Sequence, residues 1–122
     1  MLSPAHRITS AADYRRTVRS GERIRGRHCL GHVQATPAGT SARFGFIVSK
    51  AVGMAHTRNL VRRRLKAITA EFLADGLTSV DVVYRAHPSS ANASYAELRD
   101  DLRRGYSRIQ QLSEAKLEAV GQ

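Results

Sequence analysis

Apolar residues recur along the chain with two different periods, and each period predicts one type of element. A period of three to four residues, typical of a helix with one buried face, runs through an expected helix from Ala55 to Asp75. Its apolar stripe consists of Val61, Leu65, Ile68 and Phe72. A period of two, typical of a half-buried strand, occurs in Ala42–Ser49 and Val80–Arg85. A third strand candidate, Arg27–Thr36, is interrupted by Gly31.

Polar residues mark the starts of two further helices. Ser10 and Asp13 form a variant of the capping box before a helix expected over Ala11–Ser20, which ends at Gly21. The segment Ser94–Glu97 is a complete capping box and begins the last helix. The core face of that helix is formed by Tyr95, Leu98, Leu102, Tyr106 and Ile109.

The order of these elements predicts an α+β fold. A helix is followed by two or three strands, then a helix, a strand and a final helix, with a turn at Pro37–Thr40. This order implies a mixed sheet with helices packed against it. The length of 122 residues suits a single domain, which we expect over residues 1–112, followed by a flexible tail over 113–122.

The positive charge of the chain is concentrated in one segment. Lys and Arg number 20 against 10 Asp and Glu, so the net charge is +10 and the pI is about 11.0. From Arg23 to Ala70 there is no acidic residue, and this segment holds ten basic ones, which equals the whole excess. A segregated excess predicts a binding face for a polyanion, either nucleic acid or an acidic membrane surface.

The expected helix over 55–75 carries the densest part of this charge on one side. Arg58, Arg62 and Lys66 follow each other at i,i+4 spacing, and Asn59 and Arg63 flank them. Like charges at this spacing destabilise a helix by about 0.2–0.5 kcal/mol per pair, which an RNA backbone would offset as counter-anion. The alternative is an ordinary solvated helix face. A membrane surface is disfavoured, because the apolar stripe is used for the core.

Other features exclude several classes of protein. No apolar run approaches the roughly 20 residues that span a bilayer, and the start of the chain lacks the apolar stretch of a secretory signal. Cys29 is the only cysteine, so no internal disulfide is expected, and the cytoplasm is the simplest location. His28 and His32 share one face of a strand while Cys29 lies on the other, which disfavours a zinc site. We find no catalytic constellation of protein residues and interpret Cys29 as a small buried hydrophobe.

A motif in the middle of the chain resembles that of a known family. The stretch Phe44–Lys50 reads Phe-Gly-Phe-Ile-Val-Ser-Lys and is followed by Val52-Gly53 and then by Arg58-Asn59. This succession is similar to the motif of the protein subunit of bacterial ribonuclease P, in which G-x-x-V-S-K and a glycine precede an R-N-R block. Further parts of the family's pattern are resembled by Arg7-Ile8, Asp13-Tyr14 and Asp81-Val82-Val83. The likeness covers nearly the whole chain.

The resemblance implies both a fold and a function. The fold is a mixed, mainly four-stranded sheet packed with about three helices and containing a left-handed βαβ crossover. The function is to bind the catalytic RNA of ribonuclease P and the 5′ leader of precursor tRNA, and to promote endonucleolytic removal of that leader. The RNA performs the hydrolysis with Mg²⁺, so the protein alone is expected to bind no cofactor and to need no obligate protein partner.

The resemblance also assigns site residues. The helix that faces the catalytic RNA corresponds to Arg58, Asn59, Arg62, Arg63 and Lys66. The cleft for the precursor-tRNA leader corresponds to Tyr14, Val18, Ser49, Lys50 and Arg85. Three positions depart from the family's pattern: Leu60 replaces the last arginine of R-N-R, Val18 replaces an aromatic residue, and Ala51 replaces a second lysine.

Alternatives stay open at this point. The same basic face would serve a ribosomal protein or another RNA-binding domain that has no nuclease partner. A stand-alone metal nuclease would need clustered carboxylates, whereas the acidic residues are scattered outside the basic segment. Tyr14 could pack against the sheet instead of lining a cleft, and Arg85 could simply cap a strand edge.

Overall fold

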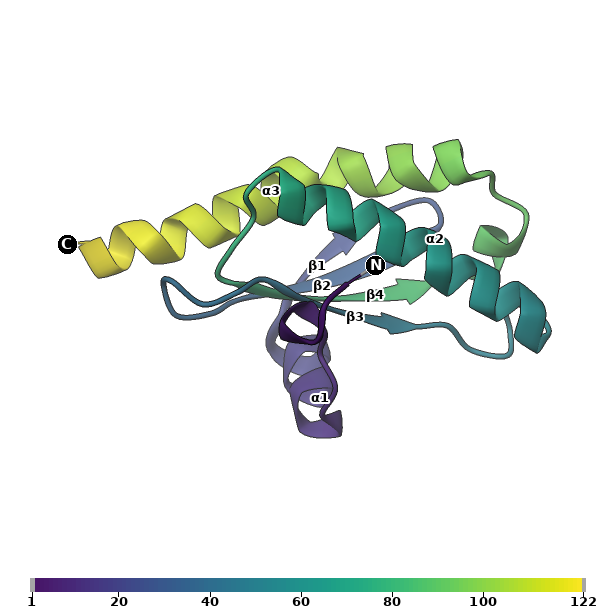
Figure 1. Cartoon of the computed structure of the whole chain (residues 1–122), viewed down its shortest axis with the longest axis horizontal. Helices are drawn as coiled ribbons and strands as arrows, with labels where there is room; N and C mark the ends of the chain where they lie inside the picture. The colour runs from purple at the N-terminus through teal and green to yellow at the C-terminus, as the bar shows by residue number, and fades with distance from the viewer. Residues whose placement is uncertain (1, 122) are drawn as a thin grey trace.

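The protein is a four-stranded sheet with helices on both faces, which confirms the predicted α+β class (Figure 1). The computed structural model describes the backbone of residues 2–121 and the side chains of residues 2–114. In chain order the main elements are α1 (Ala11–Ser20), β1 (Glu22–Arg25), β2 (Cys29–Ala35), β3 (Arg43–Ile47), α2 (Ala55–Ala74), β4 (Val80–Ala86) and α3 (Tyr95–Gly121). Two short 3₁₀ helices are η1 (Pro4–His6) and η2 (Pro88–Ala91).

The strands lie in the order β1-β2-β4-β3. The β1–β2 and β2–β4 pairs are antiparallel, whereas β3 and β4 are parallel and are joined by α2. Strand β2 continues through Gly31, so the predicted interruption there is wrong; Gly31 pairs with Tyr84 of β4. Strand β1 was not predicted, because Ile24 is the only apolar residue in it. The handedness of the β3–α2–β4 crossover stays a prediction.

Helices α2 and α3 cover one face of the sheet and α1 crosses the other (Figure 1). The predicted apolar stripe of α2 is fully buried against α3 and the sheet, since each of its residues is 0–1% exposed. Phe44 of β3 joins this core against Phe72, and Phe46 is partly buried beside Tyr84. Burial of this stripe fixes which side of α2 points away from the protein.

Helix α3 begins as predicted but its core face is shorter. Both hydrogen bonds of the capping box form: the Glu97 N–H donates to Ser94 Oγ at 3.1 Å, and the Ser94 N–H donates to Glu97 Oε1 at 2.9 Å. Tyr95 was expected in the core but is 37% exposed, because it lies in the first turn and its hydroxyl donates to Glu71 on α2 at 3.3 Å. The other four predicted core residues of α3 are buried.

Glycine ends α1 for a different reason than the one predicted. Gly21 has φ −74°, an ordinary backbone conformation, so it is not a left-handed cap. A Cβ at this position would lie 2.4 Å from the carbonyl oxygen of Thr17, so close approach of the backbone requires the glycine. By contrast, Gly76 after α2 has φ +95°, as expected for a helix-ending glycine.

The end of the chain was predicted to be a flexible tail over 113–122. The backbone of α3 continues to Gly121. Ser113 is buried, and its hydroxyl donates to the Thr78 carbonyl at 2.6 Å. The rest of the predicted tail, from residue 115 onward, has side chains that lie outside the described part of the chain.

Candidate nucleic-acid interface

Within the part of the chain whose side chains are described, acidic residues neutralise arginines in three places. On the α1 side of the sheet, Asp13 and Asp81 pair with arginines of α1 and β3. Between α2 and α3, Glu71 and Asp75 pair with Arg99 and Arg103 at 2.7–3.0 Å. At the β1 edge, Glu22 pairs with Arg108. These pairs leave the first half of α2 as a surface of cations without carboxylate partners among the side chains that are described.

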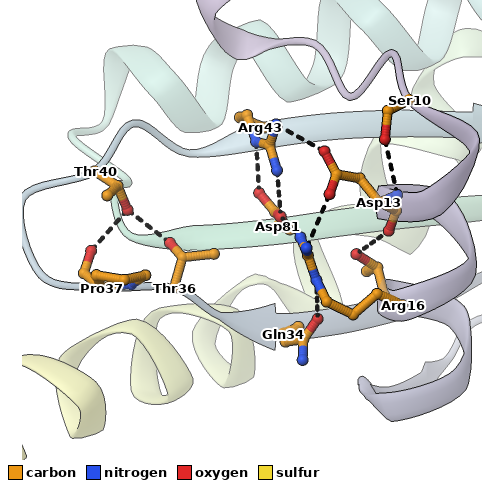
Figure 2. A network of polar contacts seen from close by, with 10 residues as sticks. Ser10, Asp13, Arg16, Gln34, Thr36, Pro37, Thr40, Arg43 and Asp81 are labelled. Carbon is orange, nitrogen blue, oxygen red and sulfur yellow. Dashed lines mark hydrogen bonds and ion pairs between the residues drawn. The ribbon is translucent and has the colours of Figure 1, made fainter.

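A buried carboxylate fixes α1 to the sheet (Figure 2). Asp81 of β4 is 0% exposed and accepts hydrogen bonds from Arg43 Nε at 2.9 Å, Arg43 Nη2 at 2.7 Å and Arg16 Nη2 at 3.1 Å. These bonds raise the pKa of Arg43 above its usual value. Asp13 joins the cluster by pairing with both arginines. Arg43 therefore belongs to the acid-free segment in sequence but is part of the structural framework in space.

The same cluster explains why the predicted capping-box variant of α1 is only half formed. The Asp13 N–H donates to Ser10 Oγ at 3.0 Å, as a capping box requires (Figure 2). The Asp13 carboxylate is held by Arg16 and Arg43, and these neighbours lower its pKa although partial desolvation raises it. Asp13 thus links the start of α1 to β3 rather than closing the cap.

The first half of α2 forms the predicted basic surface. Asn59, Arg62, Arg63 and Lys66 line a shallow open hollow of about 370 Å³. Arg62 is held in place, because its Nη1 donates to Asn59 Oδ1 at 3.2 Å and its Nη2 donates to the Val48 carbonyl at 3.3 Å. Arg58, the fifth predicted residue, is half-buried one turn earlier and does not line the hollow.

Not every arginine of this helix serves the surface. Arg64 donates from Nη1 to the carbonyl of Ala93 at 2.9 Å and so ties α2 to the segment before α3. We define the α2 cations as Arg58, Arg62, Arg63 and Lys66. None of these four pairs with a carboxylate in the described part of the chain.

The predicted leader cleft corresponds to a second hollow, on the α1 face of the sheet. It has a volume of about 280 Å³ and is lined by Tyr14, Arg15, Val18, Arg19, Ile47 and Arg85. Three of the five predicted cleft residues therefore come together. Ser49 and Lys50 are exposed in the loop after β3 and do not line this hollow.

Tyr14 is both a wall of this hollow and an anchor of α1. Its hydroxyl oxygen accepts a hydrogen bond from the Phe46 N–H at 3.1 Å. Its ring lies on the backbone of Gly45, where a Cβ would come within 2.6 Å of the ring. Tyr14 thus packs on the sheet and also lines the hollow, and its role in binding the leader stays a prediction.

Several residues at this hollow were missed. Arg15 and Arg19 were not among the residues assigned to the cleft from the sequence, but they line it beside Tyr14 and Val18. Arg15 and Arg19 have the same i,i+4 spacing as Tyr14 and Val18 and directly follow them in the sequence. A helical wheel therefore places the two arginines beside the two cleft residues. His32 of β2 lies on the same face of the sheet, buried, and neither ring nitrogen has a partner among the described residues. Burial, with help from the nearby charges of Arg85 and Arg23, lowers the pKa of its imidazole.

The two hollows lie on opposite faces of the sheet, since α1 and α2 do (Figure 1). Both present guanidinium groups, which suit forked contacts to phosphate oxygens. Within residues 2–114 no three His, Cys, Asp or Glu side chains gather as they would around a metal ion. Cys29 is buried, as predicted, and burial raises the pKa of its thiol to about 12. Among the helices described, none is long and apolar enough to cross a membrane.

Comparisons with a family profile and with individual proteins point to the same family. The sequence profile described as "Ribonuclease P" matches residues 2–110. A protein of Pseudarthrobacter chlorophenolicus named "Ribonuclease P protein component" is 46% identical over 101 residues, which cover 83% of this chain and 74% of that protein. A protein of the same name from Beutenbergia cavernae is 45% identical over 102 residues, covering 84% of this chain and 86% of that protein.

Solved structures show the same fold at low sequence identity. The RNase P protein of Staphylococcus aureus superposes with a TM-score of 0.75 and 20% identity, covering 88% of this chain and 97% of that one. The RNase P protein of Thermotoga maritima gives a TM-score of 0.75 with 17% identity, covering 85% and 97%. At these identities the likeness establishes the fold alone.

Proposed function

The chain belongs to the ribonuclease P protein family, and from this premise we propose that it binds a catalytic RNA and helps it to remove the 5′ leader of precursor tRNA. It is thus a subunit of an endoribonuclease complex. In this proposal the RNA subunit carries out the hydrolysis and the protein supplies binding surfaces. A cytoplasmic location stays a prediction.

The α2 cations support the first part of this proposal. They form a group of four positive charges without carboxylate partners in the described residues, and the buried stripe of α2 turns them outward. Each phosphate that a cation neutralises releases counterions, which strengthens binding in a salt-dependent way. We propose that this surface contacts the backbone of the catalytic RNA, with Arg62 and Arg63 at its centre.

The hollow on the α1 face supports the second part. Single-stranded RNA is recognised by stacking of bases on aromatic rings and by cations along the backbone. Tyr14 offers one ring at this hollow, worth about 1–3 kcal/mol per stacked base, while Arg15, Arg19 and Arg85 offer charge. Val18 provides apolar contact without stacking. We propose that the leader lies here, with Ser49 and Lys50 contacting it beyond the hollow.

Magnesium is assigned to the RNA. A Mg²⁺ site built by protein needs converging carboxylates, and most of the described acidic side chains instead hold arginines or backbone N–H groups, as Glu71, Asp81 and Asp101 do. Within residues 2–114, no three His, Cys, Asp or Glu side chains converge as a site for the ion would require. We propose that Mg²⁺ in the complex is held by RNA phosphates.

Reconstitution tests the function directly. Purified protein is added to a cognate catalytic RNA and precursor tRNA at low Mg²⁺ concentration. We expect faster release of the leader than with the RNA alone, and no cleavage by the protein alone. An RNA-binding domain with another role would bind the RNA without accelerating cleavage, and cleavage by the protein alone would indicate a metal nuclease.

A further inference from the structure

A half-enclosed cavity of about 260 Å³ lies between α3 and the β1–β2 side of the sheet. It is on the face covered by α2 and α3, so the sheet separates it from the hollow at Tyr14. Its walls include Ile24, Gly31, Val33 and Tyr84 from the sheet and Leu102 and Gly105 from α3. The interior is thus largely apolar, with the tyrosine as its aromatic component.

Two glycines of the cavity wall allow close packing of neighbouring side chains. A Cβ at Gly105 of α3 would lie 2.8 Å from the Ile24 side chain, and a Cβ at Gly31 would lie 3.3 Å from the Tyr84 ring. Gly105 lies in the interior of a long continuous helix, although glycine is a poor helix former. A larger residue at Gly105 would collide with Ile24, and one at Gly31 would crowd the Tyr84 ring.

The cavity contains a hydroxyl group without a partner. Tyr84 is 4% exposed, and its hydroxyl makes no hydrogen bond to any described residue. Burial raises the pKa of this hydroxyl, with further contributions from Cys29 and Asp101, which also line the cavity. Tyr84 therefore stays protonated and can donate. The Asp101 carboxylate is already occupied by the N–H groups of Arg27 and His28 at 2.7 and 2.9 Å.

The mouth of the cavity is positively charged. The side chains of Arg25, Arg27 and Arg104 border it, and none of the three has a carboxylate partner among the residues with described side chains. Arg108 also borders it but is paired with Glu22 at 2.6 Å. An anionic group at the mouth would meet arginines, while a ring system inside would meet apolar walls and one donor.

We propose that this cavity binds one unstacked nucleotide, with the base inside against Tyr84 and the phosphate at the arginines of the mouth. The volume is below the roughly 300–1,000 Å³ of sites for drug-sized ligands, which suits one planar ring system. Proteins commonly read RNA by taking single bases out of the stack into such surroundings. The inference rests on the proposed function only in naming RNA as the expected source of the nucleotide. A free mononucleotide has the same chemistry.

Titration with the four nucleoside 5′-monophosphates, followed by NMR of the backbone amides, tests the site. At least one monophosphate is expected to shift the amides of Gly31 and Gly105 and to saturate. Tyr84→Phe removes only the hydroxyl and should weaken this binding about threefold to tenfold. The matched control is Tyr106→Phe, which loses a buried hydroxyl bonded to the Phe72 carbonyl outside the cavity. The control should bind like the parent protein.

Chemical probing of the reconstituted complex separates the two sources of the nucleotide. A base of the catalytic RNA or precursor that the parent protein and Tyr106→Phe protect, and Tyr84→Phe does not, assigns the site to RNA. Saturable shifts without such a base assign it to a free nucleotide. The proposal is overturned if no monophosphate shifts these amides and no base responds, or if both variants lose binding equally. Leader cleavage in the same samples reports on the proposed function separately.

Discussion

In the first half of α2, Arg62 and Arg63 face outward, and no carboxylate among the described side chains holds them. In the second half, Glu71 and the cap residue Asp75 hold two arginines of α3. Both halves pack the same apolar stripe on the sheet. The difference lies in what the charges contact. Arg103 pairs with two carboxylates and lies over the Phe72 and Tyr106 rings at 5.1 and 5.3 Å, so it stabilises the helix pair. Arginine count alone therefore does not identify the binding surface.

The Asp81 cluster extends this contrast to the other face of the sheet. Arg43 lies in the acid-free segment like the α2 cations, yet it is bonded to a fully buried carboxylate. Arg85, which lies outside that segment, has no such partner among the described side chains and borders the hollow at Tyr14. For Arg43 and Arg85, carboxylate pairing rather than position in the sequence distinguishes the arginine that is part of the framework from the one that borders a hollow.

The largest expected effect is that of Arg43→Ala on stability. We expect a loss of about 3 kcal/mol in the free energy of unfolding, because the buried Asp81 carboxylate would keep only Arg16. The control is Arg63→Ala, an exposed α2 cation, which should change stability by less than about 0.5 kcal/mol. Urea denaturation measures both. Equal stability of the two variants would show that Arg43 is not structural.

A smaller effect concerns the pH dependence of the α2–α3 contact. The hydrogen bonds from Arg99 and Arg103 lower the pKa of Glu71 from 4.5 to about 2. Because the folded pKa is the lower one, the stabilisation is present above pH 4.5 and is lost as the pH falls towards about 2. After allowance for solvent screening it amounts to about 1–2 kcal/mol.

Unfolding free energies measured between pH 6 and about pH 2 for the parent protein and Glu71→Gln check this. The two curves should converge as the pH falls, because the parent protein loses the stabilisation by ionised Glu71 that the variant lacks at every pH. Other carboxylates with lowered pKa values, such as Asp13 and Glu22, titrate in both proteins and cancel in the difference. Parallel curves would contradict a stabilising role for Glu71.

Much of the fold and of the basic surface could be predicted from the sequence, because local patterns determine them. The stripe from Val61 to Phe72 fixes the orientation of α2, and that orientation turns Arg62 and Arg63 outward. The capping box at Ser94 fixes the start of α3. These features depend on residues three or four positions apart, so a helical period reveals them.

What could not be predicted depends on contacts between distant segments. Arg43 and Asp81 are 38 residues apart, and only the parallel register of β3 on β4 brings them together. Strand β1 has too little apolar alternation to be recognised, and its neighbours supply its stability. The sequence also does not reveal that Ser49 and Lys50 lie outside the hollow at Tyr14.

The hollow at Tyr14 should act on the leader and not on the tRNA body. Arg85→Ala is expected to weaken binding of precursor tRNA by roughly fivefold, equivalent to about 1 kcal/mol for one lost phosphate contact, and to leave mature tRNA unchanged. Arg85→Lys keeps the charge and should retain most of the affinity. Titrations of the reconstituted complex with both tRNAs measure this. Equal losses of affinity for precursor and mature tRNA would show that the leader does not bind in this hollow.

The salt dependence of binding to the catalytic RNA tests most directly whether the two halves of α2 differ as described. The log–log slope of affinity against salt concentration is measured for the parent protein, Arg62→Gln and Arg103→Gln, each corrected for the folded fraction. We predict a slope shallower by about one unit for Arg62→Gln and an unchanged slope for Arg103→Gln. An unchanged slope for Arg62→Gln, or an equal change for both variants, would contradict the assignment of the α2 cations to RNA.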